Sequence, residues 1–145
     1  MTIEIRTVQS SDYVDLLELM AELGYPTSLA ELTKRFELLL NHTEYETLVV
    51  VKNNQVIGFA GLCKALSFEF TGVLARIQAF VISSKQRKQG IGTMLLKACE
   101  EWAIQQGACS MTLNSGNREE RIPAHAFYIS NGFLGESTGF TKRLI

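Results

Sequence analysis

The segment that most constrains the fold runs from Val81 to Leu96 and joins an apolar strand to an amphipathic helix through a basic turn. Residues 75–82, which lead into it, form an apolar run that predicts a strand. Beyond the turn, apolar residues recur at helical spacing over residues 90–106, and Gly107 marks the end of that helix. This direct passage from strand to helix indicates a chain that combines both kinds of element around one core.

The remaining hydrophobic patterns complete the order β-α-α-β-β-β-α-β-α-β-β. The other helices are expected over residues 13–23, over residues 28–40, and from Pro123 to about Asn131. The other strands are expected at residues 2–8, 47–51, 56–62 and 110–113, with two short strands within 133–145 around Gly135 to Gly139. No repeat or linker divides this pattern. The sequence therefore predicts a single α/β domain of mixed α+β character over residues 1–145.

Several short polar or flexible residues mark the expected ends of these elements. Ser10 to Asp12 and Ser28 supply side chains that can cap the first two helices, and Gly24 ends the first of them. The pair Asn53-Asn54 separates two β-type runs, which predicts a hairpin.

Composition limits the classes of protein to which the chain can belong. Its 145 residues suit one domain, and 46% hydrophobic with 20% charged residues fits a globular protein with a core. The net charge of −1 argues against nucleic acid as the main partner, because such proteins usually carry a basic excess. No signal pattern and no apolar run of about 20 residues is present, so a soluble, cytoplasmic protein without membrane contact is expected.

The three cysteines, Cys63, Cys99 and Cys109, are odd in number and show no C-x-x-C spacing. Each lies in an apolar run, so all three are expected to be buried free thiols in a reducing compartment. No metal site is predicted.

The turn R-K-Q-G-I-G, residues 87–92, has the properties of an anion site. The first turn of a helix leaves backbone N–H groups without internal partners, and the helix dipole adds partial positive charge there. A pyrophosphate satisfies both, and glycine at positions 90 and 92 lets its oxygens approach the backbone. Lys85, Arg87 and Lys88 concentrate cations at the same place.

Two common phosphate-binding motifs are absent from this turn. The Walker A pattern G-x-x-x-x-G-K-[ST] does not occur, and Leu95 stands where the dinucleotide fingerprint G-x-G-x-x-G requires its third glycine. The pattern that remains is R-x-x-G-x-G. By itself it is equally typical of a solvated basic turn that begins a helix with two glycines.

A second motif, A-H-A-F-Y-I-S-N-G-F, covers residues 124–133. Alone, it is typical of a core aromatic pair on a short amphipathic helix. Together with R-x-x-G-x-G after a strand, however, the pattern A-x-x-F-Y-x-x-x-G-F resembles the GNAT superfamily of N-acetyltransferases. The L-G-Y-P sequence at residues 23–26 resembles the substrate-side helices of bacterial members. The R-x-x-A-H-x-F-Y and F-T-K-R-L sequences at residues 121–128 and 140–144 are similar to aminoalkylphosphonate N-acetyltransferases.

This resemblance implies a central mixed, mainly antiparallel sheet flanked by helices, and transfer of an acetyl group from acetyl-CoA to a primary amine of a small molecule by direct attack. It implies that the backbone of Phe80, Val81 and Ile82 pairs with the pantetheine arm, as one strand pairs with another. The pyrophosphate would be held by the turn, which comprises Arg87, Lys88, Gln89, Gly90, Ile91, Gly92 and Thr93. Members often form dimers, which leaves a homodimer open.

The resemblance places Tyr128 near the cofactor sulfur. A phenol, with a reference pKa of about 10, can give a proton to a departing thiolate whose parent thiol has a pKa of about 8.5. Tyr128 is therefore the candidate catalytic acid. Most of the rate is expected to come from alignment of the amine with the thioester.

The general base is left open. Relatives often carry a glutamate on the strand that here reads A-R-I-Q-A-F-V-I, and this chain has Arg76, Gln78 and Ala79 at the candidate positions. Glu69, His125 and ordered water are the substitutes.

The acceptor is open as well. Arg121 stands where many relatives carry asparagine, and it either binds an anionic acceptor or pairs with Glu119 or Glu120. An acidic small molecule is favoured if Arg121, Arg118 and Lys142 converge. The alternatives are a peptide or protein amine, a non-catalytic acyl-CoA-binding module, and a nucleotide-phosphate site without CoA.

Overall fold

A computed structural model of the chain describes residues 2–87, 89–115 and 121–145. The chain forms two compact units, residues 1–112 and residues 113–145. The predicted Lys88, Arg118, Glu119 and Glu120 lie outside the described residues.

The first unit is built on a five-stranded mixed sheet in the order β1-β2-β3-β4-β5. Strands β1 to β4 are antiparallel neighbours, and β5 follows β4 through a helical crossover. The strands are β1 (Ile3–Thr7), β2 (Tyr45–Lys52), β3 (Gln55–Leu66), β4 (Val73–Ile82) and β5 (Ala108–Leu113). The helices are the 3-10 turns η1 (Ser10–Asp12) and η2 (Ser84–Gln86), with α1 (Tyr13–Leu23), α2 (Leu29–Leu40) and α3 (Ile91–Gln105).

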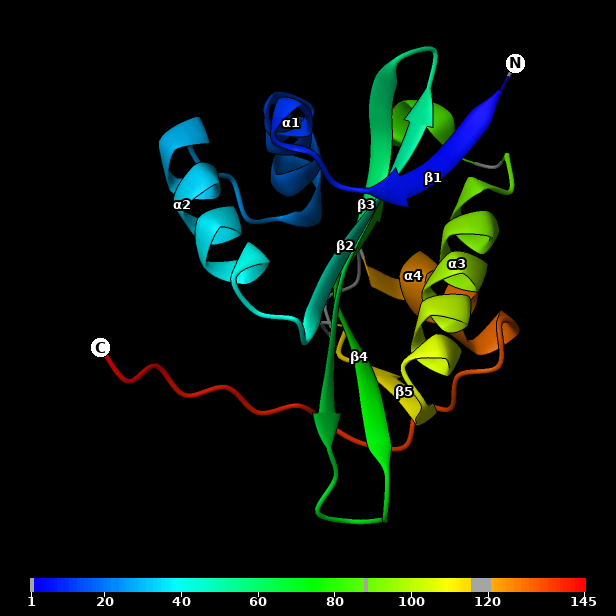
Figure 1. The fold of residues 1–145 in the computed structure, drawn as a ribbon. Helices are drawn as coiled ribbons and strands as arrows, with labels where there is room; N and C mark the ends of the chain where they lie inside the picture. The colour runs from blue at the N-terminus through cyan, green and yellow to red at the C-terminus, as the bar shows by residue number, and fades with distance from the viewer. Residues whose placement is uncertain (1, 88, 116–120) are drawn as a thin grey trace. The chain divides into compact units, whose positions relative to one another are not determined.

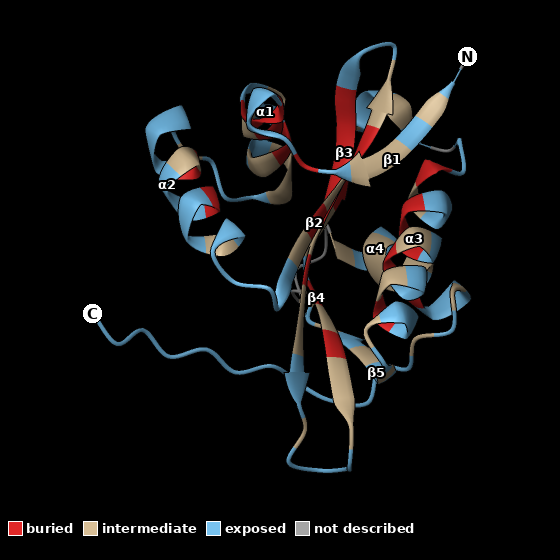
Figure 2. Ribbon diagram, viewed as in Figure 1, coloured by how far each residue is buried: buried red, intermediate tan, exposed pale blue. Residues whose placement is uncertain are grey.

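Helices cover both faces of this sheet, with α1 and α2 on one side and α3 on the other (Figures 1 and 2). The β3 run from Val56 to Ala60 is buried throughout, as expected of a strand covered on both faces. The cluster below α1 and α2 comprises Val8, Tyr13, Leu16, Leu19, Leu32, Phe36, Val49, Val56, Phe59 and Val81. Helix α3 buries Ile91, Leu95, Leu96, Cys99 and Ala103.

The signals at Ser28, Gly24 and Asn53-Asn54 are confirmed. The predicted cap of the first helix is wrong, because Ser10 to Asp12 form η1 and no side-chain hydrogen bond caps α1. The Ser28 hydroxyl accepts a 3.1 Å hydrogen bond from the Glu31 amide and caps α2. Gly24 ends α1 with φ of 105°, in the left-handed region that glycine adopts without steric cost. Asn53 and Asn54 have φ of 53° and 62°, which is the geometry of a tight hairpin turn.

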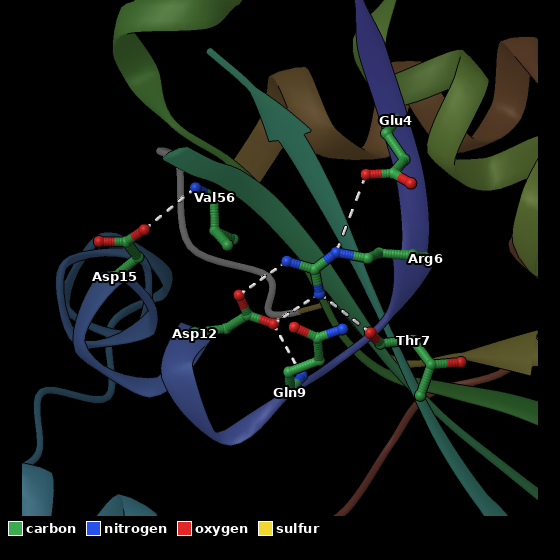
Figure 3. Close-up of polar contacts among 7 residues, drawn as sticks. All are labelled: Glu4, Arg6, Thr7, Gln9, Asp12, Asp15 and Val56. Atoms are coloured by element: carbon green, nitrogen blue, oxygen red, sulfur yellow. Dashed lines mark hydrogen bonds and ion pairs between the residues drawn. The ribbon is translucent and has the colours of Figure 1, made fainter. Parts of the chain in front are cut away.

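A polar corner ties the start of α1 to the sheet (Figure 3). The Asp12 carboxylate accepts hydrogen bonds from Arg6 Nη1 at 2.8 Å and Nη2 at 3.0 Å, and from the backbone amide of Gln9 at 2.7 Å. One turn later, Asp15 Oδ2 accepts from the Val56 amide at 3.1 Å. These bonds attach α1 to both β1 and β3, which sets the direction in which the helix crosses the sheet.

The hydrogen bonds from Arg6 hold the pKa of Asp12 below its ordinary value. Burial acts in the opposite direction, and the bond from the Gln9 amide adds to the lowering. The same pairing raises the pKa of Arg6. Asp12 is therefore a buried carboxylate whose charge is fully compensated.

The second unit contains α4 (Ile122–Ser130), which begins one residue before the expected Pro123. Gly132, with φ of 93°, follows the C-cap residue Asn131. The two strands predicted within residues 133–145 are wrong, since no strand occurs there. A strand needs a hydrogen-bonded neighbour and a face to bury, and Leu134, Phe140 and Leu144 are all exposed. The apolar residues of this segment were therefore insufficient to form strands.

The expectation of three buried thiols is partly wrong. All three cysteines are free, but only Cys99 is buried, while Cys63 is half-buried and Cys109 is exposed. Cys99 lies on the inner face of α3, where burial raises the pKa of its thiol to about 12. Cys109 lies on β5, the last strand in the sheet order, with its sulfur 3.6 Å from the Val73 carbonyl oxygen.

None of the helices in the described residues has the length and apolarity needed to cross a membrane.

Candidate cofactor site

The predicted pantetheine strand is the end of β4, which the sheet holds firmly. Its three residues pair with β3 in the register Phe80↔Ala60, Val81↔Phe59 and Ile82↔Gly58. A Cβ added to Gly58 would lie 2.6 Å from Ile82 Cδ1 and 3.0 Å from the Val81 carbonyl oxygen. Glycine at position 58 is thus required for the close approach of β3 to this part of β4.

A β-bulge precedes the same three residues. Gly61 pairs with Ala79 while Leu62 pairs with Ile77, so Gln78 is the extra residue on β4. Gln78 is exposed, and its amide Nε2 donates to Cys63 Sγ at 3.3 Å. A bulge re-aims the side chains and amides that follow it. The sequence carried no signal for this bulge beyond an ordinary apolar strand pattern.

The glycine turn leads into the N-terminus of α3. Gly90 is the N-cap residue in the left-handed region, with φ of 76°, and a Cβ added there would meet nothing within 4 Å. No side chain of the described residues caps this helix, and its first turn carries no acidic residue. The first amides of α3 and the open space before Gly90 therefore fit an anion, with Arg87 and Lys85 exposed close by in the chain.

Polar contacts from two distant elements hold this turn. Glu22 of α1 accepts a 2.8 Å hydrogen bond from the Ser84 amide, and its carboxylate lies 4.0 Å from Arg87 Nη2. Lys52, the last residue of β2, donates to the side-chain oxygens of Gln86 at 3.0 Å and Gln89 at 3.2 Å. Neither Glu22 nor Lys52 was predicted, because each meets the turn only through the tertiary fold.

Tyr128, the predicted acid, lies on α4 in the second unit and is buried. Its ring makes edge-on contacts with Phe127, at a centroid distance of 5.5 Å, and with Phe133, at 5.7 Å. The Tyr128 carbonyl accepts the Phe133 amide at 3.0 Å, which closes the end of the helix. The motif A-x-x-F-Y-x-x-x-G-F is thus a compact aromatic unit.

The candidate bases lie in different surroundings. Glu69 is exposed in the loop between β3 and β4, where an open depression of about 540 Å³ is lined by residues 66–72. That depression belongs to the loop and not to the glycine turn. His125 is half-buried on α4, three residues before Tyr128. Arg121 Nε donates to Ser115 Oγ at 3.4 Å, while Lys142 is exposed.

Comparison with known proteins agrees with this architecture. Residues 11–133 match the Acetyltransferase (GNAT) family, and this range includes the glycine turn and the Tyr128 helix. The chain belongs to the GNAT family of acetyltransferases. Acetyl-CoA is the acetyl donor of this family, so the predicted family, fold and donor are confirmed.

Individual relatives of this GNAT protein include enzymes and solved structures. The aminoalkylphosphonate N-acetyltransferase of Salmonella typhimurium is 33% identical over 96 residues, which cover 66% of this chain and 61% of that enzyme. The chain thus matches less than two thirds of that relative. An uncharacterized N-acetyltransferase of Bacillus subtilis is 26% identical, covering 90% and 91% of the two chains. A GNAT acetyltransferase structure from Staphylococcus aureus is 38% identical, with a TM-score of 0.85 and 99% and 100% coverage.

Proposed function

We propose that this GNAT protein, acting as a single domain of 145 residues, transfers an acetyl group from acetyl-CoA to a primary amine of a small molecule by direct attack. The observation that carries the proposal is the uncapped N-terminus of α3 behind an open Gly90, beside exposed cations. When bound, acetyl-CoA supplies an activated acetyl group on a thioester. The chain binds and orients acetyl-CoA and the amine, and its side chains transfer the protons.

Each predicted site residue has a role in this proposal. The amides from Arg87 to Thr93 bind the pyrophosphate, with Arg87 and Lys88 adding charge. The backbone of Phe80, Val81 and Ile82 binds the pantetheine arm, and an amide of this strand stabilises negative charge on the acyl oxygen. The bulge at Gln78, two residues before Phe80, supports this role because a bulge can re-aim the backbone that follows it.

Tyr128 donates the proton that the departing sulfur requires. Its burial between two aromatic rings supports this role, because a phenol held in one orientation needs little reorganisation to act. The amine loses its proton to His125 or to water. Glu69 is the weakest of the predicted bases, since its carboxylate belongs to an exposed loop.

A small anionic amine is the acceptor class that this proposal favours. The Salmonella relative is by its name an aminoalkylphosphonate N-acetyltransferase, and the matched sequence covers two thirds of this chain. Arg121 supplies a cation suited to a phosphonate or carboxylate, and it is half-buried beside Ser115 Oγ. A peptide amine is the alternative acceptor.

The experiment follows thiol release from acetyl-CoA with four acceptors. These are a short aminoalkylphosphonate, the matching amino alcohol without phosphonate, an amino sugar, and a peptide with a free N-terminus. The phosphonate amine is expected to have the highest kcat/KM, at least tenfold above the amino alcohol, because a charge-assisted contact contributes about 1.5–3 kcal/mol. Preference for the peptide would contradict the acceptor class. Tight CoA binding with no thiol release would identify a non-catalytic module.

Gly90→Ala is expected to raise the Kd for CoA about tenfold, because its Cβ would project into the space before the α3 amides. Gly107→Ala is the matched control. Gly107 also has a left-handed φ, of 81°, with nothing within 4 Å of an added Cβ, but it lies at the opposite end of α3. Both variants should lose about 1 kcal/mol of stability, and only Gly90→Ala should lose CoA affinity. Titration calorimetry and thermal unfolding measure the two effects, and equal Kd values in both variants would refute the anion site.

A further inference from the structure

Glu22 stands out because its position in α1 is unfavourable for a carboxylate. It lies in the last turn of the helix, where the dipole favours cations, and no basic residue occupies that turn. The side chain is nevertheless held close to the protein surface, with only 21% of it exposed. A residue that breaks a local rule in this way is commonly compensated by a contact elsewhere.

That compensation comes from the cofactor turn. Ser84 is the first residue of η2, so its backbone amide has no partner within that helix. The Ser83 hydroxyl does not bind it, because that oxygen accepts a hydrogen bond from the Lys85 amide at 3.4 Å. Glu22 Oε1 accepts the Ser84 amide at 2.8 Å. The preceding amide, of Ser83, is bound to the Ile57 carbonyl at 2.8 Å. The path from β4 into the turn is therefore fixed on one side by β3 and on the other by α1.

The same carboxylate oxygen lies 4.0 Å from Arg87 Nη2, at the far end of η2. Glu22 thus contacts both the start of the turn and the first cation of the R-x-x-G-x-G sequence. Its neighbour one helical turn earlier, Glu18, makes only an exposed ion pair, 3.5 Å from Lys85 Nζ, with 62% of the Glu18 side chain exposed. An exposed pair of that kind contributes little to structure.

We infer that Glu22 is a positioning residue for the cofactor turn, acting through its hydrogen bond to the Ser84 amide. The inference rests on the proposed function, since it assigns the turn to the pyrophosphate. The proposed function gives Glu22 no role at the acetyl group or the amine. Its effect should therefore fall on binding of the pyrophosphate-bearing donor and not on the chemical step.

The test compares Glu22→Ala, Glu22→Gln and the control Glu18→Ala in the full chain. Glu22→Ala should raise the Kd for CoA and the KM for acetyl-CoA about five- to tenfold, with kcat at saturation within about twofold of the original. Glu22→Gln should bind CoA as the unmodified chain does, because the amide oxygen can still accept from Ser84. Glu18→Ala should change neither constant by more than about twofold.

A second donor separates positioning from general damage. Acetyl-pantetheine lacks the pyrophosphate, so kcat/KM for this donor should be the same in Glu22→Ala as in the unmodified chain. An equal loss with both donors, unchanged Kd values, tighter CoA binding, or the same loss in Glu22→Gln would each overturn the inference. If the unmodified chain binds no CoA, the proposed function itself fails. Binding and turnover that are insensitive to Glu22 would refute only its positioning role.

Discussion

Tyr128→Phe should lower kcat about 100-fold while leaving the KM for acetyl-CoA within about twofold, because general acid catalysis contributes about 10²–10⁴-fold. The substitution removes one oxygen and keeps the ring that packs against Phe127 and Phe133. The thermal midpoint should therefore move little. Steady-state rates with a saturating amine measure the effect.

The matched control is Tyr13→Phe, which removes the hydroxyl of another buried tyrosine. Tyr13 stacks on Phe36 at 4.8 Å in the core and has no role in the proposed chemistry. Its variant should retain kcat within about twofold. A Tyr128→Phe enzyme with unchanged kcat would exclude the phenol as the acid.

Asp12→Ala should lower the free energy of unfolding by about 3 kcal/mol, because it removes three hydrogen bonds at a buried carboxylate and deprives the Arg6 guanidinium of its buried partner. The thermal midpoint should fall by roughly 10 °C. The control is Glu4→Ala. Glu4 approaches the same guanidinium at 3.9 Å, but 63% of its side chain is exposed, so its loss should cost less than about 0.5 kcal/mol.

The stabilisation by Asp12 should also depend on pH. The pKa of Asp12 is lower in the folded chain than in the unfolded chain, so the unfolded chain binds the proton first as the pH falls. The contribution is therefore fully present above the ordinary carboxyl pKa and is lost as the pH falls through the folded value. Chemical unfolding of the unmodified chain and of Asp12→Ala should give a difference in the free energy of unfolding that is constant near neutral pH and becomes smaller in acid. A difference that stays constant through the acid range would contradict this account.

Local patterns predicted most of the first unit. Gly24, Ser28 and the Asn53-Asn54 pair ended or began elements as expected, because each satisfies a backbone requirement within a few residues of its own position. Boundaries were less exact: β3 continues to Leu66 and β4 begins at Val73, beyond the expected limits. A paired neighbour extends a strand beyond the limits that its own pattern indicates, and the pattern of one strand does not reveal its partner.

In the glycine turn, too, local sequence predicted some features and tertiary packing decided others. Residues 75–106 alone predicted a strand, a basic turn with two glycines and a helix whose first amides are open, because these properties depend on residues that are close together in the chain. The motif around Tyr128 then indicated the family. Only the tertiary structure decided that Glu22 and Lys52 hold this turn, and that Gln78 forms a bulge before Val81. Those contacts join residues that are up to 62 positions apart, so their existence depends on how the sheet and α1 pack, which no local pattern records.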